Sequence, residues 1–268
     1  MKQGTLTTLG LHNPRQNHLL AALPSIETER LFPCLEPIPL KAGDVLSYCG
    51  GQSQYVYFPT DCIISMLHMM QDGSSTEVAT VGNEGIVGVE LFMGGGGTPR
   101  QEIVQRAGHG YRLRASILKA AFEQRGTLQE LLLRYTQALI TQMAQIAVCN
   151  RHHRVEQQLC RWLLLSLDRM ASNDVVITQE RIANMLGVRR EGVTEAACRL
   201  QKAGLLQCRR GHITVIDRAG LEAHACECYR VVRNEFERLL PLNGNDQVDT
   251  REPIAARSAP APVVSRLN

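Results

Sequence analysis

The sequence predicts an α+β protein in which an antiparallel β domain is followed by a long helix and then by a smaller domain of helices and a β-hairpin. Three observations lead to this prediction. Short apolar groups alternate with glycine turns over residues 38–114, the apolar spacing changes to that of a helix after residue 127, and two short amphipathic helices separated by a glycine follow residue 178. A chain of 268 residues is long enough for two domains.

The first part of the chain has the composition of a β domain. β-branched and aromatic residues are grouped between turn residues at intervals of roughly 8–12 residues, which is typical of an antiparallel barrel or sandwich. The predicted strands cover residues 45–48, 55–58, 63–67 and 78–81. The glycine run at residues 94–97 has no Cβ atoms, so it predicts a loop with unusual backbone freedom.

Residues 127–149 have the apolar spacing of a helix that packs against another helix. Apolar residues recur at alternating steps of four and three, which predicts a dimer seam. Leu131 and Leu133 then supply a second apolar face for the β domain, and the polar Gln142 fixes the register of the seam. The alternative is an amphipathic helix that lies on its own β domain. The seam residues are Leu128, Leu132, Tyr135, Leu139, Gln142 and Ile146.

The domain organisation follows from these changes in pattern. We expect a mobile arm over residues 1–20, the β domain over 21–126, the dimerisation helix over 127–150, a second domain over 151–240 and a disordered tail over 241–268, where Pro, Ala, Asn and Ser dominate. Further helices are predicted over residues 155–170 and 221–240.

Charge is distributed unevenly between the two domains. Residues 33–126 contain seven Lys and Arg against nine Asp and Glu, whereas residues 151–216 contain 11 against six. A basic second domain is consistent with nucleic-acid binding, and a basic solvated face without a partner would have the same composition. The chain has no apolar run of about 18 residues and no secretory signal at its start, so we expect a cytoplasmic protein with no membrane partner.

Residues 178–216 contain the motif that indicates function. Thr178 is a good N-cap for a short helix with Ile182, Ala183 and Leu186 on its inner face, and Gly187 provides the turn into a second helix over residues 189–203. Val193, Ala197 and Leu200 face inward on that second helix. A short helix, a glycine turn and a second amphipathic helix form a helix-turn-helix, whose second helix can enter a major groove.

The exposed residues of this motif suit DNA. Arginine can pair with guanine and glutamate with cytosine in the major groove, so the predicted base contacts are Arg189, Arg190, Glu191 and Thr194. A hairpin with a basic tip follows the second helix, which makes the domain a winged helix. The predicted contacts to the DNA backbone are Thr178, Arg209, Arg210 and His212.

The whole pattern resembles the Crp/Fnr family of transcription regulators over residues 38–216. The resemblance lies in KAGDVL, the strand at 55–58, Asp72-Gly73 before Val78, and TQERIANMLGVRREGVTEAACRLQKAGLL with the basic hairpin after it. It implies a jelly-roll-like N-terminal β-roll, a long dimerisation helix and a C-terminal winged helix-turn-helix.

Family membership also implies partners and residue roles. It implies a homodimer that binds a palindromic operator in double-stranded DNA and contacts RNA polymerase. It further implies that Arg190 and Glu191, which match the family's Arg-Glu pair, read a G·C pair. The family usually has arginine where this chain has Glu195, and a carboxylate there cannot donate to guanine. The family's usual half-site is therefore not assumed.

The effector is the least defined part of the prediction. Family members that bind cyclic nucleotides resemble one another in a Gly-Glu pair followed about ten residues later by Arg-Ser or Arg-Thr, which hold the ribose and the phosphate. Here the corresponding pocket residues are Glu90 and Arg100, but Glu90 follows Val89, and Arg100 is followed by Gln101 and Glu102. Cyclic AMP and cyclic GMP are therefore disfavoured, and the effector of the β-roll is unknown.

The nine cysteines are scattered through the chain and are expected to be reduced. Cys34, Cys49 and Cys62 are too few and too far apart for an iron–sulfur cluster, so none is expected.

A second group of possible ligands lies near the end of the second domain. His224, Cys226 and Cys228 are close in sequence, but on a continuous helix over residues 221–240 residues two apart face away from each other. The adjacent His152 and His153 diverge in the same way. No metal site is expected, and Cys198 and Cys208 are the candidates for a redox switch.

The chain has none of the common catalytic motifs. It lacks HExxH, a nucleophile elbow, a Walker loop and the Rossmann glycine pattern, so we expect that it is not an enzyme. The alternative function is a nucleotide-sensor or scaffold protein that keeps a relic helix-turn-helix and does not bind DNA.

Overall fold

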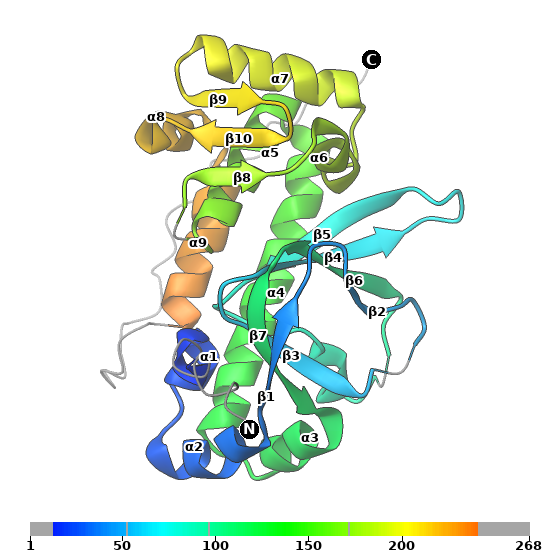
Figure 1. Ribbon diagram of the computed structural model, residues 1–268, viewed down its shortest axis with the longest axis vertical. Coiled ribbons are helices and arrows are strands. Elements are labelled where there is room, and N and C mark those ends of the chain that lie inside the picture. Colours follow the sequence, from blue (N-terminus) through cyan, green and yellow to red (C-terminus); the bar gives the residue numbers. More distant parts are fainter. Residues whose placement is uncertain (1–12, 52, 96, 171, 241–268) are drawn as a thin grey trace, which may run out of the picture.

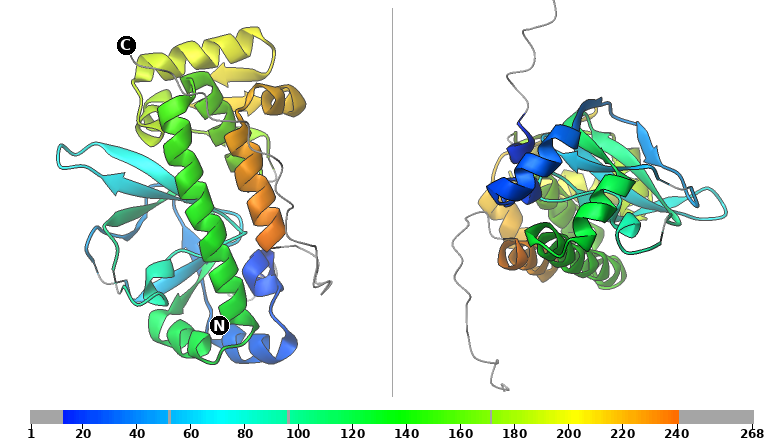
Figure 2. Two further views of the ribbon diagram at one scale, coloured as in Figure 1. Left: turned by 180° about the vertical axis from the view of Figure 1, so that it is seen from behind. Right: turned by 90° about the horizontal axis from the view of Figure 1, so that it is seen from below.

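The computed structural model describes residues 13–51, 53–95, 97–170 and 172–240. Its longest element is helix α4 (Thr127–His152), which runs through most of the height of the molecule (Figure 1). A β domain lies on one side of α4, and helix α9 (Glu227–Leu239) runs beside it (Figure 2). A smaller domain of helices and strands covers the C-terminal end of α4. The predicted α+β fold and its order of parts are confirmed.

The segment before the β domain is packed onto it. Asn17 is fully buried, and its side-chain amide donates to the carbonyls of Pro59 (2.9 Å) and Gly85 (2.8 Å). Leu19 and Leu20 belong to the main hydrophobic core. The prediction of a mobile arm is therefore wrong for residues 13–20, and residues 1–12 lie outside the described residues. The elements here are η1 (Pro14–Gln16), α1 (His18–Ala21), α2 (Ser25–Leu31) and η2 (Phe32–Cys34).

The β domain consists of two antiparallel sheets. Strands that are neighbours in a sheet are mostly not consecutive in sequence, so the chain crosses repeatedly between the sheets, as in a roll. The strand orders are β1-β7-β3 and β2-β6-β4-β5. The strands are β1 (Glu36–Leu40), β2 (Val45–Ser47), β3 (Tyr55–Pro59), β4 (Ile63–Met69), β5 (Ser75–Val81), β6 (Arg100–Arg106) and β7 (Gly108–Arg114).

The predicted strands correspond to β2 through β5, although β4 and β5 are longer than predicted. The 3-10 helix η3 (Val89–Leu91) precedes the glycine-rich loop, where Gly94 has a φ of 89°. Helix α3 (Ala115–Glu123) closes the domain. The core between the sheets and α4 contains, among others, Val56, Phe58, Ile64, Met66, Val81, Val104, Leu113 and Leu132.

The face of α4 that was predicted to meet a second copy is buried inside the chain. Gln142 donates its side-chain amide to the carbonyl of Thr80 in β5 at 3.3 Å. The ring of Tyr135 packs at the edge of Phe236 from α9, with 6.3 Å between centroids. The seam assignment is therefore wrong, and the alternative of a helix lying on its own β domain holds for these residues. All six are at most 6% exposed: Leu128, Leu132, Tyr135, Leu139, Gln142 and Ile146.

The opposite face of α4 carries the exposed apolar residues. Leu133, Ile140 and Val148 are about half exposed, and no described segment covers this face in the view from behind (Figure 2). Leu133, Gln137, Ile140 and Ala144 are exposed and follow one another at steps of four, three and four, so this face also has heptad spacing. Leu131, and not Leu133, contacts the β domain.

The smaller domain is a winged helix. Its three-stranded sheet has the order β8-β10-β9, and the β9–β10 hairpin is the predicted wing. The inner residues of both predicted helices are buried in one core with Trp162. The elements are α5 (Val155–Leu167), β8 (Asp174–Val176), α6 (Gln179–Leu186), α7 (Arg190–Lys202), β9 (Leu206–Arg209), β10 (His212–Val215) and α8 (Arg218–His224).

The winged-helix domain is docked on the β domain. The indole of Trp162 donates to the Glu77 carboxylate of β5 at 3.1 Å, and Arg169 forms an ion pair with Glu84 at 2.7 Å. Burial raises the pKa of Glu77, although Ser65, Thr80 and Trp162 donate to it. Within the described part of the chain, no helix has the length and apolar character to cross a membrane.

Candidate nucleic-acid interface

The helix-turn-helix forms as predicted, through contacts between residues that are close in sequence. The Thr178 hydroxyl accepts from the backbone N–H of Arg181 at 3.3 Å and caps α6. Gly187 ends α6 in the left-handed region with a φ of 66°, where glycine has no Cβ penalty. The backbone N–H of Val188 then donates to the carbonyl of Ala183 at 3.0 Å, which fixes the turn into α7.

The start of α7 lies at the surface. Arg189 is the N-cap of the helix, Arg190 and Glu191 begin its first turn, and all three side chains are exposed. Thr194 differs from the other predicted base-contact residues. It is half-buried, and its hydroxyl lies 2.8 Å from Oε1 of Gln179 in α6 and donates to it. Three of the four predicted base-contact residues are therefore free to reach a ligand, and Thr194 helps to hold the two helices together.

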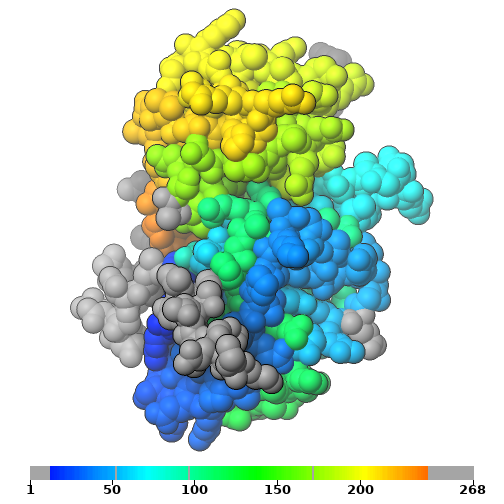
Figure 3. Space-filling model, in the orientation of Figure 1, coloured from blue at the N-terminus to red at the C-terminus, as the bar shows by residue number. Residues whose placement is uncertain are grey.

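The wing and the recognition helix share one hollow. A cavity of about 470 Å³ is lined by Thr178, Arg190, Arg209, Arg210 and His212, with the residues between them on α6 and the hairpin. The structure thus brings together the four predicted backbone-contact residues and one predicted base-contact residue. Helix α7 and the wing lie at one exposed end of the molecule (Figure 3).

Glu195 is tied to its own helix. The carboxylate is exposed and lies 3.8 Å from the Arg199 guanidinium one turn later, and Arg199 also pairs with Glu156 of α5 at 2.6 Å. The Glu156 hydrogen bond and the neighbouring carboxylates raise the pKa of Arg199. Glu195 therefore adds negative charge next to the predicted base-contact residues, where the resemblance led us to expect arginine.

The two predicted effector residues meet each other inside the β domain. Glu90 of η3 and Arg100 of β6 form an ion pair at 3.7 Å with both side chains largely buried. Burial raises the pKa of the nearby Glu102 to about 7, and Ser47 donates a hydrogen bond to it. A hollow of about 800 Å³ lies beside the glycine-rich loop, lined by Gly95, Thr98 and the end of β4, but neither member of the ion pair lines it.

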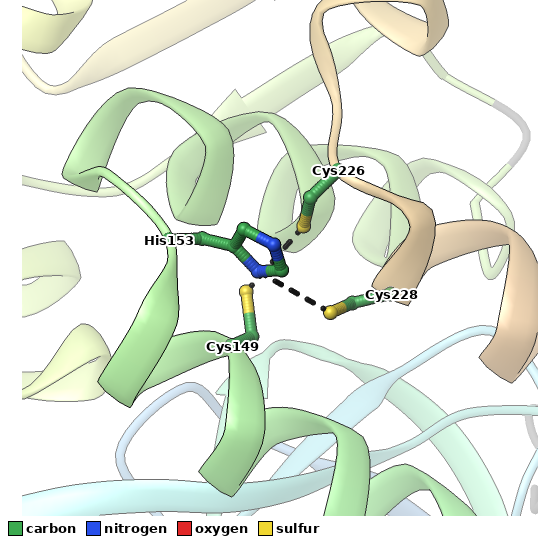
Figure 4. A group of neighbouring side chains, drawn as sticks. All are labelled: Cys149, His153, Cys226 and Cys228. Carbon is green, nitrogen blue, oxygen red and sulfur yellow. Dashed lines mark hydrogen bonds between the residues drawn. The ribbon is translucent and has the colours of Figure 1, made fainter. Parts of the chain in front are cut away.

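A cluster of metal-binding side chains lies where the sequence predicted none. Cys149, His153, Cys226 and Cys228 bring their Sγ and ring nitrogen atoms within 4.8 Å of one another (Figure 4). The prediction that Cys226 and Cys228 face away from each other is wrong, because these residues do not lie on one continuous helix. The chain breaks at Ala225 and Cys226, both in extended conformation, between α8 and α9.

The protonation of the cluster reflects its contacts. The hydrogen bond with Cys226 and then burial raise the pKa of Cys149, and the nearby Arg161 guanidinium opposes them. The same contact with Cys149 lowers the pKa of Cys226 to about 5. A C-x-C pair was visible in the sequence, but Cys149, which contacts Cys226, lies 77 residues before it in the chain.

Comparisons with known proteins agree with this geometry. The Crp-like helix-turn-helix domain family matches residues 157–224. A putative transcriptional regulator of the Crp/Fnr family from Eubacterium rectale has a similar structure, with a TM-score of 0.61 and 16% identity over 77% of this chain and 96% of its own. No curated protein matches the chain.

Other solved structures share the same fold. FixK2 from Bradyrhizobium japonicum has a TM-score of 0.61 and 15% identity over 72% of this chain and 98% of its own. The regulator CLP from Xanthomonas campestris, described as responsive to c-di-GMP, has a TM-score of 0.57 and 14% identity over 72% and 99%.

The fold and the matched domain define a protein with a β-roll, a long central helix and a Crp-like winged helix. The chain therefore contains a Crp-like helix-turn-helix domain and has the fold of solved Crp/Fnr transcription regulators.

Proposed function

We propose that the chain is a transcription regulator that binds a palindromic DNA operator as a homodimer. The observation that carries the proposal is the shared surface of α7 and the wing. Arg190 at the start of the recognition helix and Arg209 and Arg210 at the wing line one hollow. A recognition helix in a major groove would bring the wing against the adjacent phosphates, so one basic surface serves both readout and anchoring.

The roles of the residues follow from their chemistry. Arg190 donates two hydrogen bonds to guanine O6 and N7, and Glu191 accepts from cytosine N4. Arg189, Arg209, Arg210 and His212 supply positive charge or donors for phosphates, and Thr178 places the N-terminus of α6 at the backbone. The Glu195 carboxylate disfavours guanine beside it, so the operator differs from the family's usual half-site.

The exposed face of α4 supports the homodimer. Leu133, Ile140 and Ala144 leave an uncovered apolar stripe with heptad spacing along the helix, and a second copy of α4 is its simplest occupant. A two-fold dimer would present two recognition helices to two half-sites. Contact with RNA polymerase and action in the cytoplasm belong to the same proposal, as the family resemblance implies.

The β-roll is the proposed sensor; its effector is unidentified, and the buried charges in it disfavour a cyclic nucleotide. Arg100, the residue that would hold a cyclic phosphate, is already paired with Glu90. A phosphate would have to displace that carboxylate and lie near Glu102. Both changes bring negative charges together in a buried region, which is costly.

Electrophoretic mobility shift with the promoter region of the chain's own gene tests the proposal. Arg190→Ala should weaken specific binding by about 10- to 100-fold, since a good bidentate contact gives about 1–3 kcal/mol of discrimination. Arg230→Ala removes the same charge from an exposed position on α9 and should bind as the parent does. Sedimentation should show unchanged assembly for both variants.

Two results would contradict the proposal. One is a chain that forms dimers yet shifts no duplex at low salt, which would favour the scaffold alternative. The other is an equal loss of binding in Arg190→Ala and Arg230→Ala, which would indicate general charge attraction without readout by α7.

A further inference from the structure

The cluster of Cys149, His153, Cys226 and Cys228 has the ligand set of a structural zinc site. Three cysteines and one histidine form one of the standard four-ligand combinations for zinc, with every position supplied by protein. The three thiols are at most 4% exposed, and the His153 side chain is 16% exposed. They form a small buried group separate from both hydrophobic cores, so apolar packing does not explain it.

The spacing of the ligand atoms suits one ion. In a tetrahedral site with zinc–sulfur bonds of about 2.3 Å and zinc–nitrogen bonds of about 2.0 Å, neighbouring ligand atoms lie about 3.5–3.8 Å apart. Sγ of Cys149 lies 3.5 Å from Sγ of Cys226, and Sγ of Cys228 lies 3.5 Å from Nδ1 of His153. The sulfur–sulfur distance is far longer than a disulfide bond of about 2.05 Å. A [4Fe–4S] cluster would hold its ligands further apart, because each ligand binds a different iron.

Neighbouring groups orient the ligands as they do in metal sites. Nε2 of His153 lies 3.4 Å from a carboxylate oxygen of Glu227, so Nδ1 is left to face the cysteines. Metal-binding histidines commonly donate their second ring N–H to a carboxylate in this way. The side-chain amide of Gln158 in α5 donates to the carbonyl of His153 at 2.9 Å and holds the end of α4 in place.

A buried positive charge beside the cluster is a further reason to expect a bound metal ion. Arg161 is 2% exposed, and its Nε and Nη1 have no hydrogen-bond partner among the described residues. Three thiolates, a neutral imidazole and one Zn²⁺ carry a single net negative charge. A metal-loaded cluster would therefore compensate the Arg161 guanidinium, which contacts Asn150 next to Cys149.

We propose that these four side chains bind one zinc ion, which fastens the winged-helix domain to the end of α4. Cys149 and His153 precede that domain in sequence, and Cys226 and Cys228 follow it, so the ion joins both of its ends. Figure 4 shows the four side chains converging from the end of α4 and the start of α9. A metal that closes so long a loop limits the freedom of the unfolded chain and of the docked domain.

Metal analysis of the full chain is the direct test. Protein purified with a thiol reductant should contain one zinc ion per chain after gel filtration. Replacement with Co²⁺ should give the thiolate-to-cobalt charge-transfer band and the intense visible bands of a tetrahedral site. Removal of the metal with a strong chelator should lower the unfolding temperature, and added zinc should restore it.

Matched variants separate the site from other thiols. Cys228→Ser should lose the cobalt charge-transfer spectrum or bind zinc at least about 10-fold more weakly. Cys160→Ser changes a fully buried thiol of α5 outside the cluster and should keep one ion per chain. Glu227→Gln keeps all four ligands and a largely exposed position, and should weaken zinc binding by about 10-fold without changing the cobalt band positions. This last variant carries the test if Cys228→Ser does not fold.

Three results would overturn the proposal. The first is a metal-free chain that gives no thiolate charge-transfer band with Co²⁺. The second is a zinc content and affinity that are unchanged in both Cys228→Ser and Glu227→Gln. The third is a disulfide between Cys149 and Cys226 that peptide mapping finds in protein purified with the thiol reductant.

Discussion

At the scale of single residues, buried charges mark the places where this chain departs from an ordinary core. Glu77, Glu102 and Arg161 are each at most 3% exposed. Glu77 is fully supplied with donors, whereas Glu102 keeps one oxygen without a hydrogen-bond partner among the described residues. Glu102 should therefore make the stability of the β-roll depend on pH.

The sign of this dependence follows from the raised pKa of Glu102, which burial moves from 4.5 to about 7. Between these values the folded chain holds a proton that the unfolded chain has released, so the free energy of unfolding falls as pH rises. One pKa unit corresponds to about 1.4 kcal/mol, so the loss by about pH 8 is on the order of 3 kcal/mol.

Glu102→Gln should remove most of this loss, because the amide stays neutral at every pH. Urea unfolding at about pH 5 and about pH 8 measures the difference. The variant should match the parent at the lower pH and be more stable at the higher one. Glu123→Gln, an exposed position on α3, is the control. An equal fall in stability for the parent and Glu102→Gln would show that burial does not hold the proton.

At the scale of elements, the exposed stripe of α4 makes a prediction about assembly. Ile140→Glu places a charge in the middle of the proposed seam, and an unpaired charge in a helix contact is strongly destabilising. Sedimentation should show a monomer that keeps its helical circular-dichroism spectrum. Ala120→Glu adds the same charge to an exposed position of α3 and should leave the dimer intact. A persistent dimer in Ile140→Glu would mean that another face joins the subunits.

The elements also show which features could be predicted from the sequence. Helices α6 and α7 and the wing were predictable because Thr178, Gly187 and the hairpin tip act through contacts within a few residues. The seam on α4 was not, since a 26-residue helix with two apolar stripes gives no indication of which stripe faces its own domain. Only the packing of Gln142 on β5 and of Tyr135 on α9 decides this.

The cluster of Cys149, His153, Cys226 and Cys228 shows the same limit of sequence-based prediction more clearly. Cys149 and Cys226 are brought together by the docking of α9 beside α4, which is a tertiary contact. The helix breaks at Ala225, which lets Cys226 and Cys228 face one centre. No glycine or proline at the break indicates it in the sequence. Glu90 and Arg100 could be named as pocket residues from the sequence, but only the fold shows that they form an ion pair with each other.

At the scale of the whole molecule, α4 connects the parts of the fold. Its inner face holds the β-roll, its outer face is the proposed contact with a second copy, and its C-terminal end carries the proposed zinc site beside the winged-helix domain. The winged domain also touches the roll directly through Trp162 and Glu77. A change in the roll can therefore reach α7 through α4 or through this direct contact.

The proposed function depends on the start of α7 reading bases in a major groove. Methylation interference on duplexes selected from a random library tests it directly, because methylation of guanine N7 blocks the contact assigned to Arg190. We predict interference at guanines in two symmetric half-sites about one helical turn apart, and its loss in Arg190→Ala. Uniform binding with no guanine whose methylation interferes would show that α7 does not read bases in this way.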